Sequence, residues 1–366
     1  MDSFSEIISN YQKKIDKRLR EIFDEEINNY ELSSLKIKKD LRTLKEYTLR
    51  GGKRIRPILI NCGYFLSGGR NENAILDASV CVELIHNFFL IHDDIVDRDY
   101  LRRGDLSLHY FYKNKYESSL LGMSLAMIWG DMLNAFGYFP ILESKFKSEY
   151  KIEAVSILAD IIKKTCYGEI MEMLLKENLH RLLKQGCLTE DRNFKKLKGI
   201  ERDILNVYKY KTAFYTFIGP LKIGAVLAGA DSEILKNIEK AGLNLGLAFQ
   251  IKDDILGLFG AQKEIGKPVG SDIRELQPNI LIVQTLNLSE KSRRKKFVRY
   301  LGKNLKKSDI SELKNITAES GALSYCEKKM HKFIRLAKEN IINIQGRKKE
   351  KRFLLQLADY IIKRNY

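Results

Sequence analysis

The spacing of apolar residues along the chain is typical of helices. Apolar positions recur at intervals of three and four, and the alternation that marks half-buried strands is rare. Only five of the 366 residues are proline, so few helices are interrupted. Glycines separate the apolar segments, but no linker rich in Pro, Gly or Ser divides the chain. The sequence therefore predicts a single all-α domain over residues 1–366.

Two segments depart from this regular pattern. Residues 118–142 are apolar apart from Asp131, and hydropathy alone would allow a membrane-spanning helix. Gly130, Pro140 and several small residues favour instead a pair of helices buried in a soluble core, and no membrane span is expected. Residues 176–202 are polar and mixed in charge, which predicts an elaborated surface hairpin.

The chain is basic, with 64 Lys and Arg against 47 Asp and Glu and a net charge of +17. Such an excess can belong to a solvated surface, a funnel for an anionic substrate or a nucleic-acid face. The basic runs at residues 291–296 and 347–352 contain no aromatic residues on which bases could stack. We therefore interpret these runs as solvated faces and expect no nucleic-acid partner.

The cysteines and the N-terminus indicate the compartment. The five cysteines are widely spaced and form no CxxC pair, which argues against a disulfide framework and a cysteine-rich zinc site. The first twenty residues are charged and lack the apolar core of a signal peptide. A reducing, cytoplasmic location is expected.

One internal similarity points to chemistry. The segment LIHDDIVD at 90–97 resembles QIKDDILG at 250–257, and each follows an apolar helical stretch. Asp93 and Asp97 lie one helical turn apart, where like charges repel and a neighbouring apolar run adds a desolvation cost. Mg²⁺ would remove both penalties, because it takes one or two carboxylates and completes its shell with water and phosphate oxygens. For one motif alone, a helix cap or a solvated acidic turn is the alternative.

Basic residues lie near this acidic motif in the sequence. His86 falls seven residues before Asp93, on nearly the same helical stripe, although a lone helical histidine is usually structural. Arg binds phosphate with two parallel hydrogen bonds, and glycines let the backbone approach an anion. The residues that could together clamp a strongly anionic group are Lys53, Arg54, Arg56, Arg102 and Arg103. A metal-bound diphosphate beside an apolar tunnel favours ionisation to an allylic carbocation, which a neighbouring alkene then captures.

The motifs in this order resemble those of the trans-polyprenyl diphosphate synthase family, over nearly the whole chain from Gly51 to Tyr366. They are GGKRIRP at 51–57, HDDIVD at 92–97, RRG at 102–104, GD at 130–131, KT at 211–212, FQIKDD at 249–254 and GKPVGSD at 266–272. The resemblance implies an all-α isoprenoid-synthase helical bundle around a central cavity, a homodimer, and two or three Mg²⁺ ions. It further implies condensation of isopentenyl diphosphate with allylic diphosphates, with the departing pyrophosphate taking the proton.

The resemblance also implies a role for individual residues. The metal ligands would be Asp93, Asp97 and Asp253, supported by Asp94 and Asp254. Isopentenyl diphosphate would be held by Lys53, Arg56, His86 and Arg103. The allylic diphosphate would be held by Arg102, Lys211, Thr212, Gln250 and Lys267, with Lys211 also counted as catalytic.

Several positions depart from the family pattern. The second acidic motif ends in Gly257 where many members have a third Asp, and Ala261 occupies the place of a downstream substitute. The segment after Arg274 reads Glu-Leu-Gln-Pro-Asn, RRG is followed by Asp-Leu-Ser, and Glu169 and Glu172 replace the usual Gln and Asp. A catalytically weakened regulatory subunit is therefore one alternative. A class I terpene cyclase is another, although it needs no isopentenyl site.

Two aromatic residues bear on product length. Phe89 and Phe88 lie four and five residues before Asp93, which places their rings roughly 6–7 Å below the metal at the rise of an α-helix. In the family, bulky residues at both places are typical of farnesyl producers. The sequence predicts a fifteen-carbon product, with a twenty-carbon product next, and ordinary core packing of the two rings is the alternative.

Overall fold

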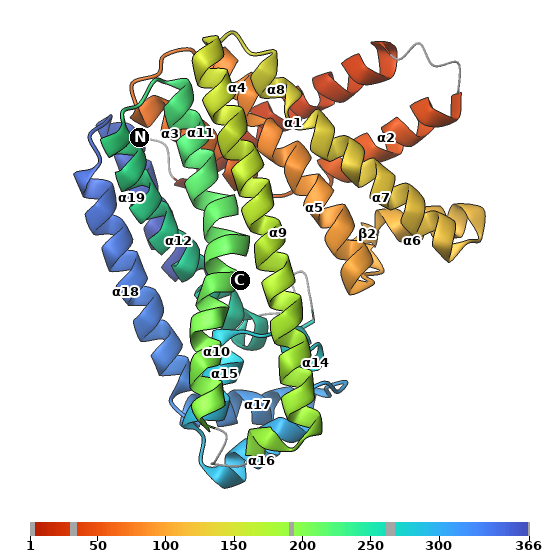
Figure 1. The fold of residues 1–366 in the computed structure, drawn as a ribbon, viewed down its shortest axis with the longest axis vertical. Helices are drawn as coiled ribbons and strands as arrows, with labels where there is room; N and C mark the ends of the chain where they lie inside the picture. The colour runs from red at the N-terminus through yellow and green to blue at the C-terminus, as the bar shows by residue number, and fades with distance from the viewer. Residues whose placement is uncertain (1–3, 30–34, 190–193, 261–267, 365–366) are drawn as a thin grey trace. The chain divides into compact units, whose positions relative to one another are not determined.

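The computed structural model describes most of the chain: residues 4–29, 35–189, 194–260 and 268–364. Within these ranges the regular structure is helical, apart from one antiparallel pair of two-residue strands (Figure 1). These strands are β1 (Leu101–Arg102) and β2 (Asp105–Leu106). The predicted all-α fold is confirmed.

The chain divides into two compact units. Unit 1 comprises residues 1–159, 220–235 and 345–353, and unit 2 comprises residues 160–219, 236–344 and 354–366. Each unit contains one of the two acidic motifs. The single domain expected from the sequence stays a prediction.

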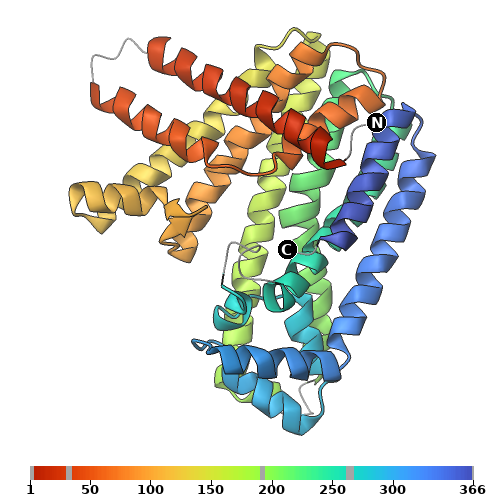
Figure 2. The ribbon, with the colours of Figure 1, turned by 180° about the vertical axis from the view of Figure 1, so that it is seen from behind.

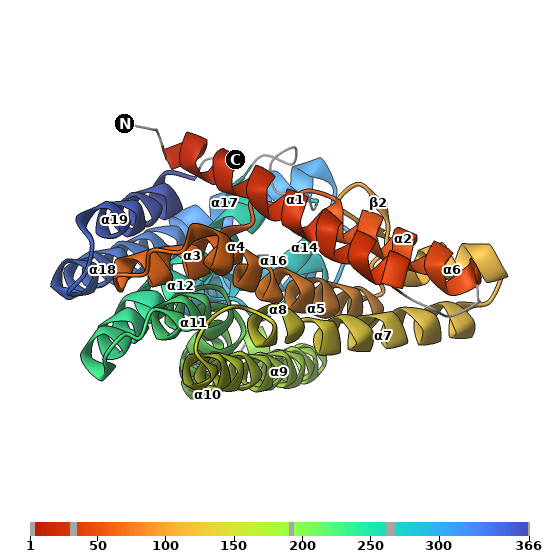
Figure 3. The same ribbon diagram turned by 90° about the horizontal axis from the view of Figure 1, so that it is seen from above.

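Unit 1 is built around the helix that carries the first acidic motif. Its helices are α1 (Phe4–Asn29), α2 (Leu35–Leu49), α3 (Ile55–Leu66), α4 (Glu72–Ser79), α5 (Cys81–Asp97), α6 (Leu108–Tyr116), α7 (Ser119–Phe136) and α8 (Phe139–Leu142). Helix α5 packs against α2, α3, α4, α6, α7 and α8, so most of its apolar side chains are buried. Figure 3 shows α5 and α7 side by side, and Figure 2 shows the pairing of α1 with α2.

Unit 2 contains the second acidic motif. Its described helices are η1 (Cys187–Thr189), α10 (Phe194–Val207), the π-helix η3 (Tyr208–Ile218), α14 (Ser271–Arg274), α15 (Ile280–Leu288), α16 (Lys291–Tyr300), α17 (Lys307–Glu319) and α18 (Ala322–Asn343). Residues of the remaining helices are divided between the units: α9 (Ser148–Lys184), α11 (Gly219–Leu227), α12 (Ser232–Phe259) and α19 (Lys348–Lys363). The apolar helix α15 packs against α10, α16, α17 and α18 and forms the centre of this unit (Figure 1).

The burial expected for residues 118–142 is wrong. Helices α7 and α8 form there, but Leu120 and Ile128 are 74% and 64% exposed. Among the described residues, two helical segments are long and apolar enough to cross a membrane: Glu72–Asp97, which is mostly buried, and Ser119–Leu142, which is mostly exposed. The two segments therefore have similar apolar composition but very different surroundings.

The segment expected to form a surface hairpin at residues 176–202 consists largely of helix ends. Residues 176–184 are the last turns of α9, and residues 194–202 are the first turns of α10. Between them the structure describes a turn and the short helix η1.

Candidate functional site

The first acidic motif lies at the C-terminal end of α5. Asp93 is partly exposed and Asp97 is exposed, whereas Asp94 between them is fully buried. Arg98 ends the helix in the left-handed region, with φ of 57°. The helix thus presents two carboxylates one turn apart to solvent and directs the third inward.

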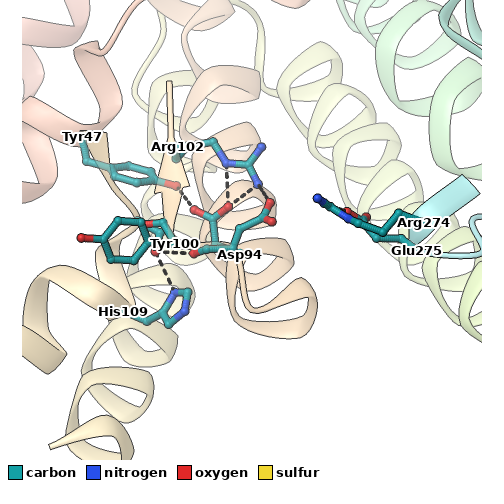
Figure 4. Close-up of polar contacts among 9 residues, drawn as sticks. Tyr47, Asp94, Tyr100, Arg102, His109, Arg274 and Glu275 are labelled. Carbon is teal, nitrogen blue, oxygen red and sulfur yellow. Dashed lines mark hydrogen bonds and ion pairs between the residues drawn. The ribbon is translucent and has the colours of Figure 1, made fainter. Parts of the chain in front are cut away.

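Asp94 is held by a tyrosine and an arginine within unit 1. Tyr47 Oη donates to Asp94 Oδ2 at 2.9 Å, and Arg102 Nε donates to Asp94 Oδ1 at 2.6 Å (Figure 4). Arg102 also contacts Asp99 at 3.2 Å. Burial raises the pKa of Asp94, and the hydrogen bonds from Arg102 and Tyr47 oppose that rise. Asp94 therefore fixes the segment that follows α5, and Arg102, expected on the allylic diphosphate, is engaged by two carboxylates here.

The turn between β1 and β2 brings the RRG motif at 102–104 into contact with the GGKRIRP motif at 51–57. Arg103 and Gly104 both have positive φ, 55° and 85°, as a two-residue hairpin turn requires. Arg103 Nη1 donates to the carbonyl of Gly51 at 2.5 Å. A Cβ at position 52 would lie 3.1 Å from the Arg103 guanidinium, so Gly52 permits this approach. Residues 52 positions apart in the sequence thus meet at Arg103.

Arg54 does not belong to the anion clamp expected from the sequence. Its side chain is 0% exposed and donates to Glu83 Oε2 at 2.7 Å, Asp16 Oδ1 at 2.8 Å and the Thr48 carbonyl at 3.0 Å. It forms a buried ion pair instead, because Glu83 is itself 2% exposed and requires a cation. The flanking cations differ: Lys53 is exposed and Arg56 is half-buried.

His86 lies on α5 among these cations. Burial lowers the pKa of its imidazole well below 6.5, and Arg56 and Arg103 lower it further. The shift disfavours the charged imidazolium, so the ring is better suited to a hydrogen bond than to supplying a positive charge. The structure brings together His86, Arg56 and Arg103, three of the residues expected on isopentenyl diphosphate.

Two aromatic rings lie about one turn before Asp93. Phe88 and Phe89 are both buried, with ring centroids 4.6 Å apart. Phe88 also packs edge-on against His92, at 4.7 Å. Two buried aromatic rings in contact therefore lie on α5 one turn before the first acidic motif.

The second acidic motif, on α12, belongs to a polar network within unit 2. Asp254 is 4% exposed, accepts a hydrogen bond from Tyr208 Oη, and accepts another from Gln250 Nε2 at 3.3 Å. Thr212 Oγ1 donates to Gln250 Oε1 at 2.8 Å. Burial raises the pKa of Asp254 well above its usual range, against the effect of the Tyr208 hydrogen bond. The structure thus joins Thr212, Gln250 and Asp254, and it adds Tyr208, which no motif in the sequence had indicated.

The glutamates that depart from the family pattern hold Lys211. The Lys211 ammonium lies 2.7 Å from Glu169 Oε2 and 2.5 Å from Glu172 Oε2, both on α9. Gly168 allows this approach, because a Cβ there would lie 2.6 Å from the Lys211 backbone nitrogen. The substitutions at positions 169 and 172 therefore place two carboxylates on a residue expected to bind an anionic substrate.

Asp253, the neighbouring carboxylate, is paired with an arginine near the end of the chain. Arg364 Nη2 contacts Asp253 Oδ1, and its guanidinium lies 4.2 Å from the ring centroid of Phe249. Arg364 is buried by these contacts. Nothing in the local sequence indicated this partner, which lies 111 residues away.

Two positions that differ from the family pattern, Gly257 and Asn279, both lie beside the Asp272 carboxylate. A Cβ at Gly257 would lie 3.0 Å from Asp272 Oδ2, and Asn279 Nδ2 donates to the same oxygen at 3.0 Å. Arg274 pairs with its neighbour Glu275 at 2.6 Å (Figure 4). Gly257 thus leaves room for the Asp272 carboxylate. Two positions of interest, Ala261 and Lys267, lie outside the described residues.

The carboxylates suit Mg²⁺ better than a metal that needs a full protein cage. In the part of the chain that the structure describes, no three His, Cys, Asp or Glu residues converge into a metal-binding group. Mg²⁺ requires only one or two carboxylates, since water and substrate phosphates complete its shell. Asp93 and Asp97, on the solvent side of one helical turn, meet that requirement, and Asp253 offers a single further carboxylate.

Comparison with known proteins settles the family. The model of the polyprenyl synthetase family matches residues 38–319. This chain belongs to the polyprenyl synthetase family. It is similar to the geranylgeranyl diphosphate synthase of Saccharolobus solfataricus, with 32% identity over 352 residues, 93% of this chain and 97% of the relative. It is also similar to the geranylfarnesyl diphosphate synthase of Aeropyrum pernix, with 32% identity over 319 residues, 86% of this chain and 91% of the relative.

Solved structures support the same assignment. The geranylgeranyl pyrophosphate synthetase of Pyrococcus horikoshii superposes with a TM-score of 0.76 at 26% identity, covering 99% of this chain and 100% of that chain. The geranylgeranyl pyrophosphate synthase of Corynebacterium glutamicum, complexed with isoprenyl diphosphate and magnesium, shares the fold, with a TM-score of 0.84 at 24% identity and coverage of 97% and 98%. The enzyme class predicted from the sequence, a short-chain prenyltransferase of the polyprenyl synthetase family, is confirmed.

Proposed function

We propose that this enzyme condenses isopentenyl diphosphate with allylic diphosphates in a Mg²⁺-dependent reaction and releases geranylgeranyl diphosphate, with farnesyl diphosphate as the shorter product. The observation that carries the proposal is the hydrogen bond from Arg103 to the Gly51 carbonyl, which brings the RRG turn to the segment that contains Lys53 and Arg56. A cyclase has no use for an isopentenyl site, whereas a chain-elongating enzyme must bind that second diphosphate. The sequence alone predicted the fifteen-carbon product first, from Phe88 and Phe89, but the similarity to geranylgeranyl diphosphate synthases favours the twenty-carbon product.

Each group of residues has a distinct task in this reaction. Asp93, Asp97 and Asp253 would hold Mg²⁺, which when bound withdraws charge from the leaving diphosphate. On the isopentenyl side, His86 would contribute a hydrogen bond and the arginines would contribute charge. On the allylic side, the Thr212 and Gln250 pair presents oxygen and amide groups from two helices.

The hydrocarbon part of the reaction needs dry, unreactive walls. Phe88 and Phe89 offer buried aromatic surface one turn from Asp93, which keeps water from a carbocation and limits the length of the growing chain. No side chain is required as a strong base, because the departing pyrophosphate can take the proton.

The function is tested by incubating the purified full chain with isopentenyl diphosphate, Mg²⁺ and each allylic diphosphate in turn. We expect linear products that are longer than the primer, and none when EDTA replaces Mg²⁺. Cyclic hydrocarbons would contradict the proposal in favour of a terpene cyclase. Absence of turnover until a second protein is added would contradict it in favour of a regulatory subunit.

We propose that the enzyme is a homodimer that uses the exposed side of α7. Leu120, Met127 and Ile128 lie on this helix and are all exposed, and such an apolar surface is costly to leave in water. A second copy of the chain would bury it. Sedimentation analysis tests this: Ile128→Glu should shift the enzyme to a monomer, whereas Glu117→Lys, a charge change just before the same helix, should not.

We further propose that the enzyme works in the cytoplasm. All five cysteines are free thiols in the structure, as expected for a reducing compartment. Fractionation of the native cells with an antibody against the chain tests this. Recovery in the cytosolic fraction is expected, and recovery with washed membranes would contradict it.

A further inference from the structure

Tyr208 joins three segments of unit 2 through one hydroxyl group. The residue is 3% exposed and is the first residue of the π-helix η3. Its hydroxyl donates to Asp254 Oδ2 on α12 and accepts a hydrogen bond from the backbone N–H of Ile280, the first residue of α15, at 2.9 Å. One side chain therefore ties the start of η3 to the second acidic motif and to the central helix of the unit.

From Asp254 the hydrogen bonds continue back to η3. The second oxygen of Asp254 accepts from Gln250 Nε2, and Gln250 Oε1 accepts from Thr212 Oγ1. Thr212 lies four residues after Tyr208 on the same π-helix. The four side chains form a closed path that begins and ends on η3, and π-helical segments are often found at functional sites.

The Asp254 carboxylate depends on its donors because it is buried. A buried carboxylate is costly unless each oxygen is hydrogen-bonded. The amide of Ile280 also points at Asp254 Oδ2, but at 3.3 Å, so the hydroxyl of Tyr208 is the nearer donor to that oxygen. Burial raises the pKa of Tyr208 well above 10, which keeps the hydroxyl protonated and able to donate.

We propose that Tyr208 is a positioning residue for the allylic diphosphate: it fixes Asp254, and through it the amide of Gln250 and the hydroxyl of Thr212. This inference rests on the proposed function, which assigns Gln250 and Thr212 to the allylic substrate. Loss of the hydroxyl should let Asp254 shift and the Gln250 amide rotate, which would disturb the hydrogen bond from Thr212.

Tyr208→Phe removes the hydroxyl and keeps the ring. Tyr300→Phe is the matched control, because Tyr300 Oη also donates to a carboxylate. Its partner is Glu312, so this hydrogen bond joins α16 to α17 and does not involve the second acidic motif. In Tyr208→Phe we expect the KM for the allylic diphosphate to rise about tenfold, the usual scale for loss of a residue that orients a ligand-binding group. The KM for isopentenyl diphosphate should change less than about twofold.

A second measurement is independent of turnover. Calorimetric titration with inorganic pyrophosphate in the presence of Mg²⁺ should show about tenfold weaker binding for Tyr208→Phe. The Tyr300→Phe variant should match the wild type in both assays. In a double-mutant cycle, Tyr208→Phe should add little to the effect of Gln250→Ala, because both changes break the same path.

The outcomes separate the two proposals. If the wild type is active and Tyr208→Phe leaves the allylic KM and pyrophosphate affinity unchanged, the positioning role is overturned. Equal rises in both KM values, with melting temperatures lowered in parallel, would also overturn it, because a merely structural role has that effect. A wild type without turnover would overturn the proposed function, while pyrophosphate affinity would still decide the role of Tyr208.

Discussion

The buried ion pair between Arg54 and Glu83 offers a direct test of the division between structural and substrate-binding cations. The two side chains are 0% and 2% exposed, and the Arg54 Nη1 to Glu83 Oε2 distance is 2.7 Å. Arg54 also bonds to Asp16 and to the Thr48 carbonyl, so each of its nitrogens has a partner. Arg54→Met replaces the cation with an apolar chain of similar length.

The expected loss in the free energy of unfolding follows from the unpaired charge that each substitution leaves buried. Arg54→Met leaves the Glu83 carboxylate buried without its cation, and such a change costs about 3–5 kcal/mol. Glu83→Leu leaves the guanidinium in the same position, although Asp16 still offsets part of its charge. The double variant removes both charges, so it should be more stable than the sum of the single changes by about 2 kcal/mol or more.

Urea unfolding followed by circular dichroism at 222 nm measures these free energies. Lys14→Met is the matched control, because it breaks an ion pair at 2.5 Å between half-exposed side chains and should cost less than about 1 kcal/mol. The double variant should keep the KM for isopentenyl diphosphate within about threefold of the wild type, because Lys53 and Arg56 are untouched. A loss below 1 kcal/mol in Arg54→Met, or strict additivity, would refute the reasoning.

Three further predictions concern chain length, pH and the metal. Replacing Phe88 and Phe89 by Ala should lengthen the products, which chromatography by chain length would show. An unchanged product distribution would mean that other residues limit the chain length. His86 has a lowered pKa, so the unfolded chain binds a proton that the folded protein does not; stability should fall as the pH drops below about 6.5, by up to about 1.4 kcal/mol per unit. Between pH 6.5 and 5.5 the wild type should lose more stability than His86→Gln, and equal losses would contradict this. Arg364→Gln removes the cation paired with Asp253, so the Mg²⁺ concentration for half-maximal activity should fall by about threefold; an unchanged or higher requirement would contradict it.

The sequence predicted the parts of the site that depend on local spacing. The one-turn separation of Asp93 and Asp97 and the helical class follow from periodicity, and the structure shows both. The family resemblance placed Thr212 and Gln250 on the same substrate, which stays a prediction, and the two side chains share a hydrogen bond.

The remaining features depend on contacts between distant residues. Lys53 and Arg54 are adjacent and chemically alike, yet one is exposed and the other buried, because only the fold brings Glu83 and Asp16 to Arg54. Tyr208 meets Asp254 across 46 residues, so no local pattern marks it. The apolar composition of residues 118–142 predicted a buried segment. Composition cannot distinguish apolar side chains on an exposed face from buried ones, and several of these side chains are exposed.

The central claim is that each acidic motif binds a metal ion that activates the diphosphate. The most direct measurement is an anomalous difference map from crystals of the full chain grown with Mn²⁺ and an unreactive allylic diphosphate analogue. The account predicts manganese peaks within about 2.3 Å of carboxylate oxygens of Asp93 or Asp97 and of Asp253. Analogue density with no peak at either motif, or with Arg364 still on Asp253 and manganese bound elsewhere, would contradict it.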